Sequence, residues 1–223
     1  MGVVGLALLA APTRAQLCAG RAAFADGRAQ VAGGADLEDF RTVVSEVAIG
    51  TARGYGQVSF GTIHVPELGG SALGLSVLAG SQVPMDRAGT WHFCPVGSVS
   101  IALGPNNLDV NGNGTVIIDA KEMHFVFSLN VGAIAARVGE VQLIPTGSLS
   151  GVAAHAWLKD QRGETTASTT EYFGVVDLGI GVLVQRVVSF RALASILLGL
   201  DGASTGYEIS ASVNFGKRLT PRP

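Results

Sequence analysis

Apolar and polar residues alternate strictly along residues 207–215, the last strand-like stretch of the chain. Odd positions carry tyrosine, isoleucine, alanine, valine and phenylalanine, whereas even positions carry glutamate, serine and asparagine. A period of two predicts a β-strand with one apolar and one polar face. A soluble sheet on a hydrophobic core and a membrane strand with lipid on one side both give this pattern.

The same pattern recurs along the chain and predicts an all-β protein of ten strands. The expected strands are 29–37, 42–49, 55–65, 72–82, 91–103, 123–135, 141–157, 172–185, 188–198 and 207–215. The pattern is least clear in the first two, so eight strands are the alternative. No run of about 20 apolar residues follows residue 15, which argues against a membrane-spanning helix.

Connection lengths give a second signal, because short and long connections alternate. Residues 52–54, 136–140 and 185–188 form short connections, whereas 104–122, 158–171 and 199–206 form long polar ones. Outer-membrane barrels have short periplasmic turns and longer outer loops. We therefore predict a closed antiparallel up-and-down transmembrane β-barrel over residues 29–216.

In this barrel, apolar residues such as Phe125, Leu178 and Ile209 face lipid, and polar residues face the lumen. The predicted lumen-facing polar residues are Glu46, Gln57, Ser98, Asn130, Asp177, Arg191 and Glu208. Side chains fill most of the interior of so small a barrel. Either a hydrogen-bonded polar core or a narrow passage for small solutes is compatible with these residues.

The two ends of the chain read as separate segments. Residues 1–15 combine an apolar run with a small-residue cleavage site, which predicts a signal peptide. We expect residues 16–28 to form an N-terminal periplasmic segment and residues 217–223 a C-terminal tail.

Composition supports an exported strand-rich chain. Glycine is frequent, with 31 of 223 residues, and charged residues make up only 14%. The net charge of −2 provides no basic patch, so nucleic acid is not an expected partner.

Several short runs resemble a known family. The segment 16–18 with its early cysteine, the run 91–96 (WHFCPV), the later 143–145 (LIP) and the final strand 209–216 are similar to the small outer-membrane β-barrel domain proteins of Gram-negative bacteria. The resemblance implies a closed barrel in the bacterial outer membrane, surrounded by lipid and inserted by the barrel assembly machinery. Many members have no known activity. This chain departs from the pattern because residues 216–223 follow the terminal aromatic Phe215, where many such barrels end.

The chain has two cysteines, Cys18 and Cys94. An oxidising periplasm favours a bond between an isolated pair. The predicted topology brings both to the periplasmic end of the barrel, with Cys94 in the lumen-facing register. We predict a Cys18–Cys94 disulfide, with two unpaired thiols as the alternative, and we expect no catalytic role for either residue.

One loop partly matches a calcium-binding loop. Asp109, Asn111 and Asn113 provide oxygen ligands at positions 1, 3 and 5, and a glycine follows at position 6. Position 12, where an acid is required, is Ala120, and Asp119 lies one residue early. Because Asn–Gly and Asp-rich segments are also ordinary turn chemistry, a plain loop without metal is the favoured interpretation.

The sequence predicts no enzyme and no cofactor. His155 and Trp157 share the outward face near the outer end of their strand, but no serine and acid join them there. This pair is more simply explained by the aromatic belt of a membrane barrel. His64, His92 and His124 are spread singly along the chain, and this spacing does not predict a zinc site.

The expected function is therefore structural or surface-interacting, without catalysis. A narrow pore for small solutes is the alternative. A soluble lipocalin-like barrel that binds a ligand on an inward apolar face is a second alternative. The sequence does not indicate the oligomeric state.

Overall fold

The structure is a computed structural model of the chain. It describes residues 29–36, 43–50, 54–65, 70–104, 107–109, 115–117, 119–159, 164–185, 187–199 and 205–215. The predicted signal peptide, N-terminal periplasmic segment and C-terminal tail lie outside these residues, as does Cys18. No helix in the described part of the chain is long and apolar enough to cross a bilayer.

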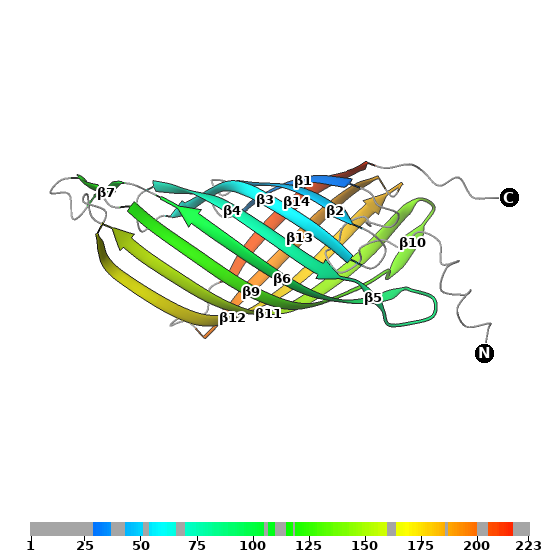
Figure 1. Cartoon of the computed structure of the whole chain (residues 1–223). Helices are drawn as coiled ribbons and strands as arrows, with labels where there is room; N and C mark the ends of the chain where they lie inside the picture. The colour runs from blue at the N-terminus through cyan, green and yellow to red at the C-terminus, as the bar shows by residue number, and fades with distance from the viewer. Residues whose placement is uncertain are drawn as a thin grey trace.

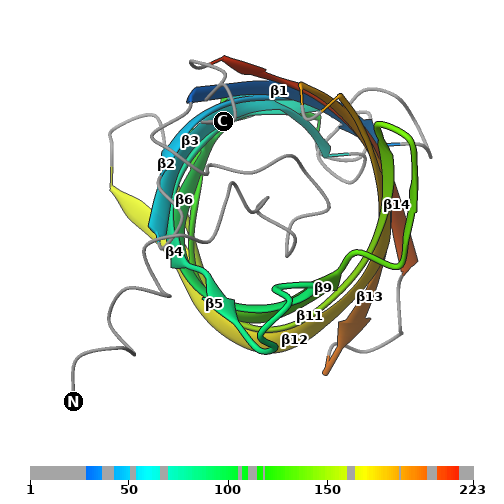
Figure 2. The same cartoon turned by 90° about the vertical axis from the view of Figure 1, so that its right-hand side faces the viewer.

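The wall of the molecule is a single antiparallel sheet that closes on itself (Figures 1 and 2). Its strands are β1 (Ala29–Asp36), β2 (Val43–Gly50), β3 (Gly54–Val65), β4 (Gly70–Ser81), β6 (Trp91–Leu103), β9 (Asp119–Ala133), β11 (Val141–Lys159), β12 (Thr165–Val184), β13 (Val188–Leu198) and β14 (Thr205–Phe215). Closure comes from β1, which pairs with β2 on one side and with β14 on the other. The ten-stranded barrel is confirmed, and the eight-stranded alternative is wrong.

The alternation of the sequence places the apolar side chains on the outside of this wall. Phe127, Leu178 and Phe215 are 58%, 60% and 55% exposed, whereas Ser210 and Asn214, which alternate with the apolar residues of β14, are buried. Exposed apolar side chains on every wall strand form a band that suits hydrocarbon. A lipocalin would have the opposite orientation, with its apolar face around an inner ligand, so that alternative is not supported.

The barrel has two different ends. At the turn end, β1 begins and β14 ends, with Ala29 opposite Phe215, and short connections join β2 to β3 and β12 to β13. At the loop end, opposite, lie the connections from β6 to β9, from β11 to β12 and from β13 to β14. In Figure 1 the turn end is on the right and the loop end is on the left.

Several connections are more ordered than the sequence pattern predicted. At the turn end, β5 (Val83–Pro84) pairs with β6, and β10 (Ala136–Val138) pairs with β11. At the loop end, β7 (Asn107–Asp109) and β8 (Thr115–Ile117) pair inside the connection expected to be a plain loop.

The wall strands β9, β11 and β12 also extend further toward the loop end than predicted. The segment 158–171, expected to be a long loop, is mostly a continuation of the β11–β12 pair, which reaches Lys159 and Thr165. The period of two is lost there because both faces of the hairpin carry polar residues, so alternation could not reveal the strands.

Candidate functional site

The lumen contains a polar cavity of about 230 Å3 at mid-height. Five of the predicted lumen residues line it, from strands on opposite sides of the barrel: Glu46, Gln57, Asn130, Asp177 and Arg191. The sheet register places these residues on the inner face, and the strand alternation therefore positions the cavity.

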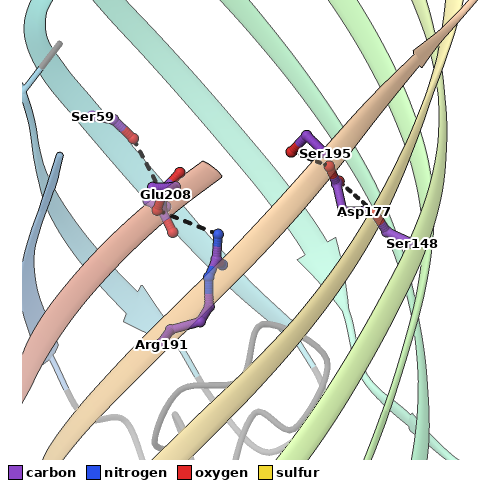
Figure 3. Close-up of polar contacts among 7 residues, drawn as sticks. Ser59, Ser148, Asp177, Arg191, Ser195 and Glu208 are labelled. Carbon is purple, nitrogen blue, oxygen red and sulfur yellow. Dashed lines mark hydrogen bonds and ion pairs between the residues drawn. The ribbon is translucent and has the colours of Figure 1, made fainter. Parts of the chain in front are cut away.

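Asp177 of β12 is the centre of a hydrogen-bonded group in this wall (Figure 3). The Ser148 hydroxyl of β11 donates to Asp177 Oδ2 at 2.6 Å, and the Ser195 hydroxyl of β13 donates to Oδ1 at 2.7 Å. Both serines lie directly opposite Asp177 on the neighbouring strands. Hydrogen bonds from both sides stabilise a carboxylate in a partly buried position.

Arg191 and Glu208 form a charged pair in the lumen. Arg191 Nη2 lies 3.4 Å from Glu208 Oε1, and the two side chains are 15% and 40% exposed. Figure 3 shows the Ser59 hydroxyl of β3 pointing toward Glu208 of β14. The predicted residue Ser98 is not in this cavity, but lines a second one.

The second lumen cavity, of about 250 Å3, lies nearer the loop end and is lined by Ser98, Ser100, Glu122 and His124 among others. His124 Nε2 is 2.7 Å from Glu122 Oε1, and Ser100 lies opposite His124 in the β6–β9 register. The spacing of the histidines in the sequence predicts an isolated His124, and the structure instead pairs it with Glu122. The signal that could have located this pair is the spacing of two residues on one strand, which puts both side chains on one face.

At the turn end, the lumen-facing side chains are closed to solvent. His92, Cys94, Ile144, Leu183 and Ser189 are each at most 1% exposed. Solvent therefore does not reach these five inward-facing side chains.

Polar and apolar contacts together fill this end. Gln30 Nε2 donates to Ser212 Oγ at 2.8 Å, and the Ser189 and Ser212 hydroxyls are 2.5 Å apart. Beside them, Ile144 and Leu183 form a fully buried apolar cluster against which Ile134 packs. This cluster was not predicted from the sequence, because apolar residues occupy both faces of the strands there and the alternation is lost.

Cys94 is the lumen-facing cysteine of the turn end. It is 0% exposed and is not a free thiol, and the Asn130 side-chain amide donates to its carbonyl at 3.0 Å. The Cys18–Cys94 disulfide stays a prediction, because Cys18 lies outside the described residues.

The turn between β4 and β6 is organised by Asp86. The Thr90 hydroxyl and the N–H groups of Thr90 and Trp91 donate to its carboxylate. The hydrogen bond from the Thr90 side chain, followed by that from the Trp91 backbone, lowers the pKa of Asp86 below its ordinary value of 3.8.

On the outer face, His155 and Trp157 lie where the sequence placed them. Their rings are 5.3 Å apart, and His155 Nδ1 lies 2.8 Å from the Thr170 hydroxyl on the neighbouring strand. This is the geometry of a polar–aromatic rim.

An apolar groove of about 940 Å3 crosses the outer face between Phe125, Phe127 and Tyr172. A side chain at Gly97 or Gly151 would meet nothing within 4 Å, so these glycines leave the groove open. In a bilayer, acyl chains are the surrounding material that fills such a groove.

The calcium candidates are only partly described. Asp109 ends β7 opposite Thr115 of β8, and Asp119 begins β9. Asn111 and Asn113 lie outside the described residues, so calcium binding stays untested. Among the residues that the structure does describe, no three acidic, histidine or cysteine side chains gather as a metal site.

Comparison with known proteins gives no match to a protein-family model and none to a curated protein. Similar solved structures include Ail, the attachment invasion locus protein of Yersinia pestis, with 13% identity, a TM-score of 0.42, and coverage of 85% of this chain and 99% of that one. The beta domain of the Bordetella autotransporter BrkA has 14% identity, a TM-score of 0.46, and coverage of 85% and 99%. The N-terminal β-barrel domain of Pseudomonas aeruginosa OprF has 10% identity, a TM-score of 0.28, and coverage of 84% and 96%.

At this level of similarity, the assignment depends on the geometry of the chain itself. A closed wall of antiparallel strands has no free edge in the bilayer, and its outward apolar band faces hydrocarbon while its inner face is largely polar. The chain is therefore a closed ten-stranded β-barrel of the outer-membrane type.

Proposed function

We propose that this barrel is a non-conducting, non-catalytic surface-interaction protein, with its turn end in the periplasm and its loop end outside the cell. Short periplasmic turns and longer outer connections support this orientation. The barrel would then hold the extended β11–β12 hairpin at the cell surface.

The observation that carries the proposal is the burial of the lumen at the turn end. Gln30, His92 and Ser189 point inward, yet each is only 1% exposed. An ion crossing the barrel would have to displace these side chains and the Ile144–Leu183 cluster. The polar interior therefore supports a filled barrel rather than an aqueous channel.

Planar-bilayer recording tests this proposal. We expect the folded full-length protein to insert without producing conductance, with insertion checked by heat-modifiable mobility on gels. A steady pore of reproducible size would contradict the proposal.

A narrow pore is the second candidate, and the two lumen cavities favour it. The described lumen carboxylates include Glu46, Glu122, Asp177 and Glu208, whereas Arg191 is the one arginine or lysine whose described side chain lines the cavities. If the barrel conducts, this charge balance predicts a preference for cations.

A further inference from the structure

The two edges of β12 are paired over different lengths. Its pairing with β11 runs from Thr165 to Val184, along the whole strand. Its pairing with β13 covers only Gly174–Val184. In the described part of the chain, residues 165–173 therefore have a strand neighbour on one side only.

This one-sided segment lies at the loop end, beyond the closed wall. In Figure 2 the start of β12, in yellow, projects outside the ring of strands. Thr165 and all residues from Ala167 to Tyr172 are exposed. The segment is thus accessible from the side that we propose faces the environment.

An open strand edge presents unpaired N–H and C=O groups to which another strand can bond. Proteins usually protect such edges with lysine, proline or a bulge, but residues 165–173 (TTASTTEYF) contain neither lysine nor proline. The one register shift of the β11–β12 pair leaves Thr166 as an extra residue near the start of this segment, and residues 167–173 continue in regular register. Threonine also has a high preference for extended structure, which keeps the edge in strand conformation.

We propose that residues 165–172 of β12 bind an extended segment of a partner protein as an added β-strand. Strand addition of this kind draws affinity from main-chain hydrogen bonds and specificity from alternate side chains. This inference deepens the proposed surface-interaction function and rests on it.

A second copy of the chain does not fit this edge. Two barrels in one membrane are related by an axis along the membrane normal, and barrel strands tilt by about 35–45° from that direction. The two edges would then cross at roughly twice the tilt, which prevents a continuous ladder of hydrogen bonds. A flexible segment of another protein can align with the edge without this restriction.

The side chains of the edge indicate what that segment carries. Thr170 and Tyr172 lie on the outward face of β12, and Thr169 and Glu171 lie on the other. Directly opposite side chains across a strand pair contribute when they match in shape or charge. The expected partner sequence therefore alternates β-branched residues, which suit Thr170 and Tyr172, with basic residues, which suit Glu171.

The test uses a fluorescent ten-residue peptide of alternating valine and lysine, with the folded full-length protein in detergent micelles. Fluorescence anisotropy measures binding. The matched control peptide carries N-methyl groups on two adjacent central residues, so that neither of its edges forms a continuous ladder. We expect saturable binding of the first peptide and loss of binding with the second.

Proline variants locate the binding edge. Successive residues of a strand direct their N–H groups to opposite edges. Of the two variants Thr169→Pro and Thr170→Pro, one therefore removes a donor from the edge that faces β11, and the other removes a donor from the open edge. We expect that variant to keep heat-modifiable mobility and to bind about tenfold more weakly. Thr169→Ala and Thr170→Ala keep every N–H group, and we expect them to lose less affinity than that proline variant.

Amide hydrogen exchange gives a readout that does not depend on the variants. Added-strand pairing should slow exchange at alternate residues of 165–172, whereas binding through side chains alone would not give this alternation. No saturable binding up to about 1 mM peptide, equal binding of the N-methylated control, or protection without alternation would each overturn the edge site. None of these results would change the expectation that the barrel does not conduct in planar bilayers. Conversely, a steady pore would overturn the proposed function without affecting the peptide result.

Discussion

Solvent reaches the two ends of the lumen to very different extents. At the turn end, the inward-facing His92 and Ser189 are 1% exposed. Toward the loop end, the inward-facing Glu122 and Glu208 are 45% and 40% exposed. The same alternation of residues along the strands therefore gives a lumen that is closed to solvent at the turn end and accessible toward the loop end.

The difference follows from what the inner face carries at each level. At the turn end, the Ile144–Leu183 cluster adds apolar packing to the serine and glutamine hydrogen bonds. Toward the loop end, carboxylates and serines surround cavities, and β12 continues past its last partner on β13. We infer that the turn end stabilises the barrel and that the loop end is free to interact.

The largest expected effect at the turn end comes from the predicted disulfide. The variant Cys94→Ser should lower the free energy of unfolding by roughly 4–5 kcal/mol, because a Cys18–Cys94 disulfide would restrict a loop of the unfolded chain. Urea unfolding in micelles measures this change. Cys18→Ser should give the same loss, and the double variant should add nothing to it. Titration of two free thiols in the native protein would contradict the pairing.

A core substitution compares the two ends directly. Leu183→Ala should cost about 2–5 kcal/mol of unfolding free energy, because Leu183 is 0% exposed and its loss leaves a cavity. Thr169→Ala, on the exposed edge of β12, should change the same quantity by less than about 0.5 kcal/mol. Equal losses from the two variants would remove the distinction between a stabilising end and a free end.

At mid-height, Asp177→Asn should have a smaller effect. In this variant an NH2 group, which cannot accept a hydrogen bond, replaces one of the two carboxylate oxygens that Ser148 and Ser195 contact, and the charge is lost. We therefore expect a loss of about 1–3 kcal/mol. Ser98→Ala, which changes the second cavity instead, is the matched control and should have a lesser effect. A change at Asp177 no larger than the control would show that this group is not a structural centre.

The smallest expected effect concerns pH and the turn between β4 and β6. The folded pKa of Asp86 lies below its ordinary value of 3.8, so its stabilising contribution is complete above that value and is lost as pH falls through the lower folded pKa. Comparing urea midpoints at pH 7 and pH 3, we expect wild type to lose slightly more stability than Asp86→Asn. An identical acid response in the two proteins would contradict this role of Asp86.

The sequence predicted the strands that cross the bilayer well. The predicted ranges 91–103 and 188–198 coincide with β6 and β13. These strands have lipid on one face and a polar lumen on the other, and this contrast produces a strict period of two.

The features that the sequence did not predict lie where the contrast between the faces disappears. Residues 165–171 are polar except for Ala167, so the extension of β12 left no alternation. Residues 182–184 are apolar throughout, so Leu183 was not recognised as part of an inner cluster. The strand preference of threonine was the remaining signal for the extension, and it is weaker than periodicity.

Access of a bulky, water-soluble maleimide to single cysteines tests the central difference between the two ends most directly. Glu122→Cys and Ser189→Cys would each be labelled in the folded barrel, with the parent protein as background, and the adducts counted by mass. We expect rapid labelling at position 122 and labelling at position 189 only after unfolding. Equal labelling rates at the two positions in the folded protein would contradict a lumen that is closed at one end and open at the other.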